Sequence, residues 1–113
     1  MFFFKTFVKS QSFSNLFYYK QTFNDDINNW DVSSVTKMNY MFWNADSFNQ
    51  NISSWDVSSV TNMQVMFKDA LSFNQDISDW DVSSVYNMNN MFLNANGLSD
   101  ENKCAIHLSF SSN

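Results

Sequence analysis

The sequence contains no proline and no arginine, and it has one glycine and one cysteine. Because Gly97 stands alone and proline is missing, tight turns are left to Asn, Asp and Ser. These residues tolerate unusual backbone angles and hydrogen-bond to their own backbone. A single cysteine, Cys104, excludes an intramolecular disulfide and a cysteine-based metal site.

Positive charge is scarce, and the formal net charge is −5 at pH 7. Within residues 23–97, nine aspartates stand against two lysines, Lys37 and Lys68. An acidic surface of this kind repels phosphate backbones and anionic membranes, so we expect no nucleic-acid partner. No apolar run approaches the roughly 20 residues of a membrane span, so we expect no membrane insertion.

The first residues are apolar but are interrupted by Lys5 and Lys9. A secretory signal places its positive charge first and about 7–15 apolar residues after it. The order here is the reverse. We therefore expect a ragged half-repeat or a fragment boundary at this end, and no visible signal peptide.

The abundant residues form a repeat. Residues 23–47, 48–72 and 73–97 are three consecutive versions of one 25-residue unit, here called copies 1, 2 and 3. Thirteen of the 25 positions are identical in all three, and nine of these are apolar. One unit cannot bury its own Phe, Ile, Trp and Met side chains, whereas stacked units can. The sequence therefore predicts a stack of copies with one shared core.

Within each copy the apolar spacing suggests two kinds of element. From Val35 to Ala45 the apolar residues are separated by 3, 3, 1 and 3 positions, which is typical of one helical face. The same pattern recurs at 60–70 and 85–95. Serines stand where the helix N-caps would lie, at Ser34, Ser59 and Ser84.

The other half of each copy predicts extended structure. We expect a short strand at Asn49–Ile52 and a second extended piece at Trp55–Val57. Parallel crossovers are usually right-handed. The predicted fold is therefore an α/β repeat solenoid, a right-handed stack of strand-plus-short-helix units.

Both ends of the repeat region predict caps. Residues 1–22 resemble a degenerate half-repeat, because Phe13 and Phe17 lie one period before Met38 and Phe42. In the segment 98–113, Ser99 followed by two acids is a helix start. We expect a C-terminal capping helix over 99–110.

The unit FNQDISDWDVSSVYNMNNMFLNA resembles the repeat of BspA-type leucine-rich-repeat surface proteins, with the pattern F-N-x-D-I-S-x-W-D-V-S-x-V-T-x-M-x-x-M-F. The resemblance covers 23–97 closely and 13–22 loosely. It implies a fold like that of leucine-rich repeats, a cell-surface or extracellular location and a role in adhesion. Such proteins usually continue into a Trp/Tyr-containing tail, which implies that this chain is truncated at its C-terminal end.

Two polar rows run through the copies, Asp31, Asp56 and Asp81, and Asn24, Asn49 and Asn74. Like charges stacked about 5 Å apart repel one another, so something must offset that cost. We favour hydrogen bonds from the following Val-Ser-Ser turn, and a calcium ladder is the alternative. The Asn row is interpreted as an inward structural ladder that bonds its own turn and the next copy.

The remaining candidates for chemistry are sparse. Cys104 and His107 lie three apart, so they share a helical face, but no further metal ligand or orienting group is evident. We therefore expect ordinary packing there. The sequon at Asn51 stands where the other copies have Asp, and chance explains it best. We expect no metal, no cofactor and no enzymatic activity.

Positions that vary between the copies are free to face solvent or a partner. On the predicted helices they form one outward stripe: Tyr40, Trp43, Val65, Lys68, Asn90 and Leu93. Tyr and Trp are enriched at binding hot spots. A solvated face with scattered apolar residues is the other interpretation.

Two functional hypotheses follow. The first is a surface-associated recognition or adhesion module that binds a protein or a glycan through a repeat face. The second is a structural spacer that displays other domains in a longer surface protein. A binding module predicts an exposed aromatic patch on one face, whereas a spacer predicts a uniformly polar surface.

Overall fold

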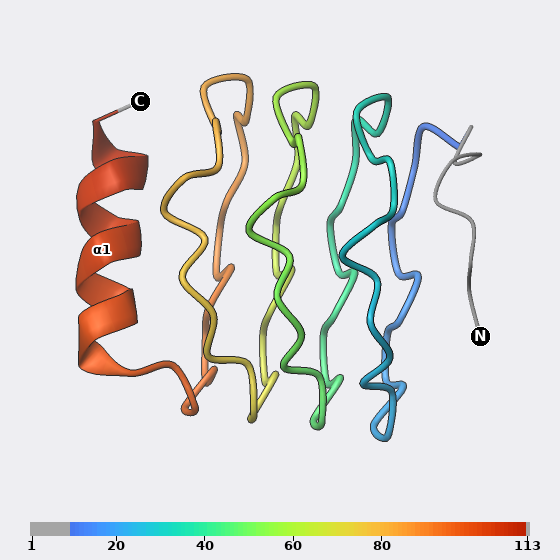
Figure 1. The fold of residues 1–113 in the computed structure, drawn as a ribbon, viewed down its shortest axis with the longest axis vertical. Coiled ribbons are helices and arrows are strands. Elements are labelled where there is room, and N and C mark those ends of the chain that lie inside the picture. Colours follow the sequence, from blue (N-terminus) through green and yellow to red (C-terminus); the bar gives the residue numbers. More distant parts are fainter. Residues whose placement is uncertain (1–9, 113) are drawn as a thin grey trace.

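The structure is a computed structural model that describes residues 10–112. The predicted cap over residues 1–22 therefore falls partly outside the described residues, as do Lys5 and Lys9. Within residues 10–112 there is one helix, α1 (Asp100–Ser111), and no strand. Three isolated parallel bridges join residues 25 positions apart, Ser12 to Lys37, Lys37 to Asn62 and Asn62 to Asn87. Figure 1 shows the copies side by side, with α1 next to copy 3.

α1 begins where the sequence predicted a helix. The Ser99 side chain accepts a hydrogen bond from the Asn102 backbone N–H at 3.1 Å, which satisfies one donor of the first turn. Asp100 and Glu101 lie at the positive end of the helix dipole. Ile106 is buried against the repeats, so α1 covers part of the end of the stack.

The apolar segment of each copy is a chain of overlapping turns, here called the turn ribbon. In copy 1 the N–H groups of Met41, Trp43 and Ala45 donate to carbonyls three residues back, at 3.0–3.4 Å. Tyr40 and Asn44 have positive φ, as type II turns require at their third residue. The turn ribbons comprise residues 13–20, 38–45, 63–70 and 88–95.

The alternate N–H groups of each turn ribbon point to the next copy. In copy 1, Met38 donates to the Asn62 carbonyl at 2.9 Å and Tyr40 donates to the Gln64 carbonyl at 3.0 Å. Each of the first three turn ribbons makes four such bonds, all 2.8–3.1 Å long. Neighbouring copies are therefore held in register by their backbones as well as by their side chains.

This arrangement corrects the predicted fold. The segments expected as helices, beginning with Val35–Ala45, are turn ribbons, and the expected strand at Asn49–Ile52 is not formed. Since α1 is the one helix and no sheet is present in residues 10–112, the predicted right-handed α/β solenoid of strand-plus-helix units is wrong. A helix would direct every N–H along its own axis, whereas here half of them bond to the neighbouring copy.

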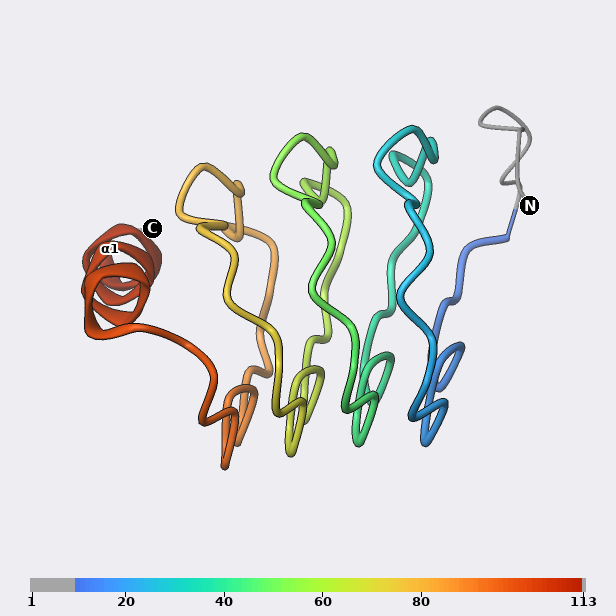
Figure 2. The same ribbon diagram turned by 60° about the horizontal axis from the view of Figure 1, so that its bottom comes forward.

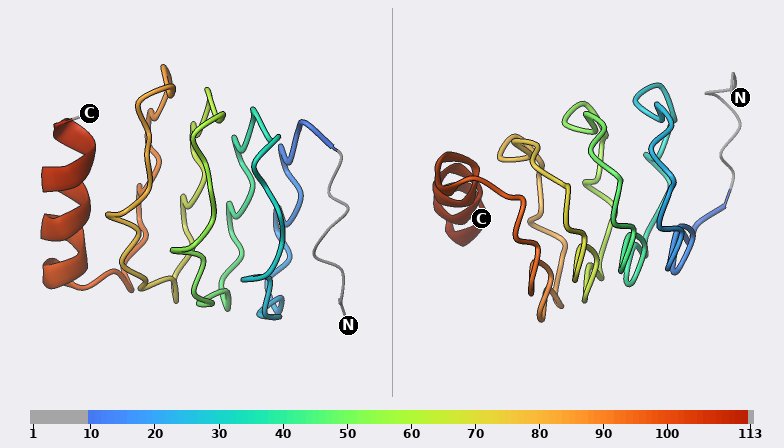
Figure 3. Two further views of the ribbon diagram at one scale, coloured as in Figure 1. Left: turned by 45° about the horizontal axis from the view of Figure 1, so that its top comes forward. Right: turned by 90° about the horizontal axis from the view of Figure 1, so that it is seen from below.

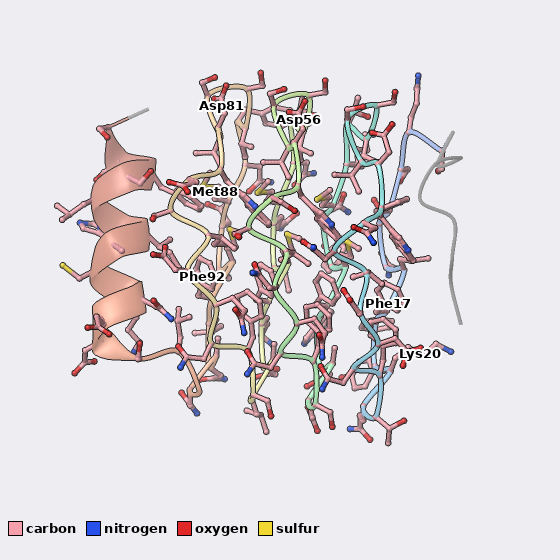
Figure 4. The ribbon with its side chains drawn as sticks, viewed as in Figure 1. Phe17, Lys20, Asp56, Asp81, Met88 and Phe92 are labelled. Carbon is pink, nitrogen blue, oxygen red and sulfur yellow. The ribbon has the colours of Figure 1, made fainter. Side chains whose placement is uncertain are left out.

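The core consists of aromatic ladders that run through the copies. Phe42 stacks on Phe67 at 5.4 Å between ring centroids, and Phe67 stacks on Phe92 at 5.5 Å. Phe42 of copy 1 also stacks on Phe48, the first residue of copy 2, at 4.2 Å. Figure 4 places Phe17 and Phe92 at opposite ends of this ladder. Phe42 and Phe67 each have an equivalent ring on both sides, which favours the same residue in every copy.

The copies and α1 form one body with Cα extents of 34 × 30 × 19 Å and a radius of gyration of 12.9 Å. Figures 2 and 3 show the same succession of copies from other directions, with α1 at the C-terminal end in each. Because the copies are aligned, the turns at the two ends of each copy form two rows, one along each edge of the molecule.

Candidate functional site

The six varied positions all lie on turn ribbons, at equivalent places in successive copies. Asn90 and Leu93 are exposed, whereas Tyr40, Trp43 and Lys68 are half-buried. Val65 is only 8% exposed, so it does not belong to an outward stripe. The predicted stripe is therefore interrupted in copy 2, where Val65 is buried, and its solvent-accessible residues on copies 1 and 3 are separate.

Three tyrosine side chains gather around Trp43, and we call the four residues together the aromatic cluster: Tyr18, Tyr19, Tyr40 and Trp43. The Trp43 ring lies 5.1 Å from Tyr18, 5.9 Å from Tyr19 and 5.8 Å from Tyr40, between centroids. Tyr19 is 48% exposed, and the other three rings are half-buried. The cluster is therefore open to solvent mainly at Tyr19 and partly at the other three rings.

Polar groups of copies 2 and 3 fix the orientation of Trp43. The Lys68 Nζ lies 4.7 Å from the centroid of the Trp43 ring, in a cation–π contact. The Trp43 Nε1–H donates to Asp69 at 3.2 Å, and Lys68 forms an ion pair with the same carboxylate at 3.3 Å. The Asn94 side-chain amide also donates to Asp69 at 3.0 Å. The indole therefore has one preferred orientation.

These contacts change the titration of Asp69. The hydrogen bond from Asn94 lowers the pKa of Asp69, and the hydrogen bonds from Trp43 and Lys68 and the Lys68 charge lower it further, against an opposing effect of burial. Asp69 is therefore held as the carboxylate that Trp43 and Lys68 require.

Sequence reasoning missed Tyr18, Tyr19 and Asp69. Tyr18 stands one period before Trp43, so extending the repeat backwards by one turn ribbon would have found it. Tyr19 and Asp69 share an equivalent position with positive φ, at 58° and 57°. That position holds Asn44 and Asn94 in the other copies, and Asn tolerates this conformation. The recurrence of Asn and Asp at this position could have indicated a turn with positive φ there.

The Asp row lies in exposed turns at one rim of the molecule, where Figure 4 labels Asp56 and Asp81. In each copy the carboxylate accepts two hydrogen bonds from the serine two residues on. For Asp56, Oδ1 accepts the Ser58 N–H at 3.1 Å and the Ser58 Oγ–H at 2.6 Å. Asp31 and Asp81 make the same pair of bonds. No group of three or more potential metal ligands occurs among residues 10–112.

The same bonds affect the pKa of the carboxyl group in copy 3. The Ser83 side-chain hydrogen bond, followed by the Ser83 backbone N–H, lowers the pKa of Asp81 below its ordinary value. The serine of each turn thus donates hydrogen bonds that stabilise the charged carboxylate of the Asp row.

The Asn row links the copies through side-chain oxygens. The Asn24 Oδ1 accepts the Asn49 N–H, and the Asn49 Oδ1 accepts the Asn74 N–H, each at 2.8 Å. Asn74 continues the row to the Ser99 N–H at 2.9 Å, at the start of α1. Asn24 and Asn49 are exposed, so the row lies at the surface and not inside as expected.

The remaining candidates are dispersed. Cys104 and His107 are exposed on α1, and Asn51 is exposed in copy 2, where its side chain accepts the Ser53 N–H at 2.9 Å. Over the described part of the chain, no helix is long and apolar enough to cross a bilayer. The aromatic cluster is therefore the site at which the structure brings together partly exposed aromatic side chains suited to recognition.

Comparisons with known proteins give one result. The model of a family described as "Mycoplasma protein of unknown function, DUF285" matches residues 8–105, which includes all three copies and the first part of α1. No curated protein and no solved structure matches the chain.

Proposed function

The chain belongs to the DUF285 family, and on that premise we propose that it is a non-enzymatic recognition or adhesion module at a cell surface, binding a protein or glycan ligand through the aromatic cluster. The match over residues 8–105 supports a repeat domain, and the resemblance of the 25-residue unit to BspA-type surface proteins supports the location and the adhesive role.

The observation that carries this proposal is the support beneath Trp43. An exposed aromatic residue gains binding energy most readily when its orientation is already fixed, because less conformational entropy is lost on binding. Lys68 covers the indole and Asp69 holds its N–H. Trp and Tyr in such settings are the residue types that dominate binding hot spots.

The neighbouring residues also favour a binding role over a spacer role. A spacer has no need of apolar side chains at its surface, yet Tyr19 is 48% exposed and Leu93 is 44% exposed. Both lie on turn ribbons of the same kind. Around Tyr19 the other rings of the aromatic cluster are partly exposed, and exposed apolar patches often mark interaction sites.

The test removes exposed rings while keeping the backbone conformation. Tyr19→Asn and Tyr40→Asn both suit positive φ, and Asn already occupies the equivalent places as Asn94 and Asn90. We expect the double variant to keep its melting temperature within a few degrees and to bind cells or an immobilised glycan panel at least about tenfold more weakly.

The matched control is Tyr86→Ala, because Tyr86 is 75% exposed and lies outside the aromatic cluster. It should bind like the unmodified protein. Equal binding by the double variant and the control would contradict the proposal and favour the spacer. The glycan panel and a protein-stripped cell preparation separate a glycan ligand from a protein ligand.

A further inference from the structure

A cavity of about 470 Å³ lies between copy 3 and α1. Its size is in the range of ligand sites in proteins. Met88, Met91 and Phe92 line it from the turn ribbon of copy 3, and Ile106 and Phe110 line it from α1. Figure 4 labels Met88 and Phe92 on the copy beside the helix. The cavity is therefore apolar on both walls.

Copy 2 shows what covers these side chains when a further copy follows. In copy 2 their equivalents Met63, Met66 and Phe67 are fully buried, because copy 3 covers them. Met88 and Phe92 are only partly buried, because α1 does not fill the same space. The cavity lies on the side of copy 3 where the turn ribbon of a further copy would pack.

The backbone of copy 3 is unpartnered along the same segment. The four N–H groups that would donate to a following copy, here called the N–H row, are those of Met88, Asn90, Phe92 and Asn94. None of them has a hydrogen-bond acceptor within the described part of the chain. In every preceding turn ribbon the equivalent four are paired at 2.8–3.1 Å. An open edge of this kind is a template for an added peptide segment.

We propose that the C-terminal cavity binds a peptide segment that has the sequence pattern and the conformation of a turn ribbon, and that adds to copy 3 as a further copy does. The carbonyl oxygens of alternate peptide residues accept from the N–H row. The peptide's Met-x-x-Met-Phe side chains stack on Met88, Met91 and Phe92. This site lies at the opposite end of the stack from Tyr19 and Tyr40 and does not depend on the aromatic cluster.

The chain itself defines the chemistry of the occupant. In copy 2, residues 62–69 supply the carbonyl oxygens that accept hydrogen bonds from the N–H groups of copy 1, at 2.9–3.0 Å. The side chains of Met63, Met66 and Phe67 in the same segment pack in the core. A free peptide with the sequence of residues 60–71 therefore carries both halves of the recognition pattern.

The experiment titrates the isotope-labelled protein with the synthetic peptide of residues 60–71 and follows backbone amides by NMR. We expect saturable shifts in the N–H row and hydrogen exchange there slowed at least about tenfold. The amides of Met63 and Phe67, which are already bonded, should change little. A peptide in which both Met residues and the Phe are replaced by Ser should not bind.

A pair of variants on α1 locates the site. His107→Trp fills the cavity from its rim, whereas Leu108→Trp, on the adjacent and 64% exposed residue, leaves the cavity open. We expect His107→Trp to weaken peptide binding at least about tenfold and Leu108→Trp to leave it unchanged. Three results would each overturn the proposal: no binding, binding without slowed exchange in the N–H row, and equal binding by both variants.

Discussion

The buried Phe and Trp side chains of the three copies stack on their equivalents in neighbouring copies, and Trp55 shows what that implies for single residues. Its ring stacks on Trp80 at 6.5 Å with an interplanar angle of 3°, and its Nε1–H donates to the Ile27 carbonyl at 3.1 Å. Trp55 therefore joins three successive copies. Removal of this side chain affects two interfaces at once.

Trp55→Ala should lower the free energy of unfolding by about 3–5 kcal/mol, the usual range for truncating a large buried aromatic residue. A small domain has about 5–15 kcal/mol in total. Chemical denaturation of the purified variant measures the loss. Tyr86→Ala, at a 75% exposed ring, is the control and should change little. Equal stability of the two variants would show that the Trp row is not part of the core.

Asp69 links the stability of the molecule to pH. Its folded-state pKa lies below the ordinary value of 3.8, chiefly because Asn94 donates to the carboxylate. A group with a depressed folded-state pKa stabilises the fold fully above its unfolded pKa, and this stabilisation is lost as the pH falls through the folded value.

Asp69→Asn should therefore lower the melting temperature at pH 7, where the variant lacks the ion pair with Lys68 and one acceptor for Trp43. The difference from the unmodified protein should shrink as the pH falls below 3.8. Asn tolerates the positive φ of this position, so backbone strain does not confuse the result. A difference that stays constant down to pH 2 would contradict the electrostatic explanation.

The turn ribbon is the element that sequence reasoning could not identify. Apolar residues at Met38, Met41, Phe42 and Ala45 have helical spacing because each overlapping turn closes after three residues, as a helical turn nearly does. Side-chain periodicity reports which residues are buried, not where the N–H groups point. The direction of those groups depends on contact with the next copy, which a single sequence does not show.

Other features at this scale could be predicted. The repeat boundaries place Phe, Trp and Met in ladders because identical residues at a fixed period bury one another only when neighbouring copies align. The start of α1 followed from Ser99 and the two acids after it. The aromatic cluster was predicted only in half, through Tyr40 and Trp43, because its other members belong to the degenerate first turn ribbon.

The link between copy 3 and α1 depends on Gly97. A Cβ added there would overlap the Leu71 carbonyl oxygen, a backbone atom that cannot move away easily. Gly97→Ala should therefore cost about 1–3 kcal/mol, as overpacking does. Ser72→Ala, at the equivalent exposed place in copy 2, should be close to neutral. Thermal melting of the two variants compares them, and equal melting temperatures would show that the link adjusts freely.

At the scale of the whole molecule, the stack is asymmetric. Every turn ribbon but the last donates its alternate N–H groups to a following copy, and copy 3 instead meets α1 across an apolar cavity. The aromatic cluster lies near the other end, on residues 18–43. The two ends therefore offer different surfaces, one aromatic and rigid and one with an open backbone edge.

Amide hydrogen exchange on the isotope-labelled protein tests the central claim, that the copies are joined by alternate N–H groups and that this pairing stops at copy 3. The amides of Met38 and Met63 should exchange slowly, and those of Met88 and Asn90 should exchange at least about tenfold faster. Equal protection of these four amides would contradict the account.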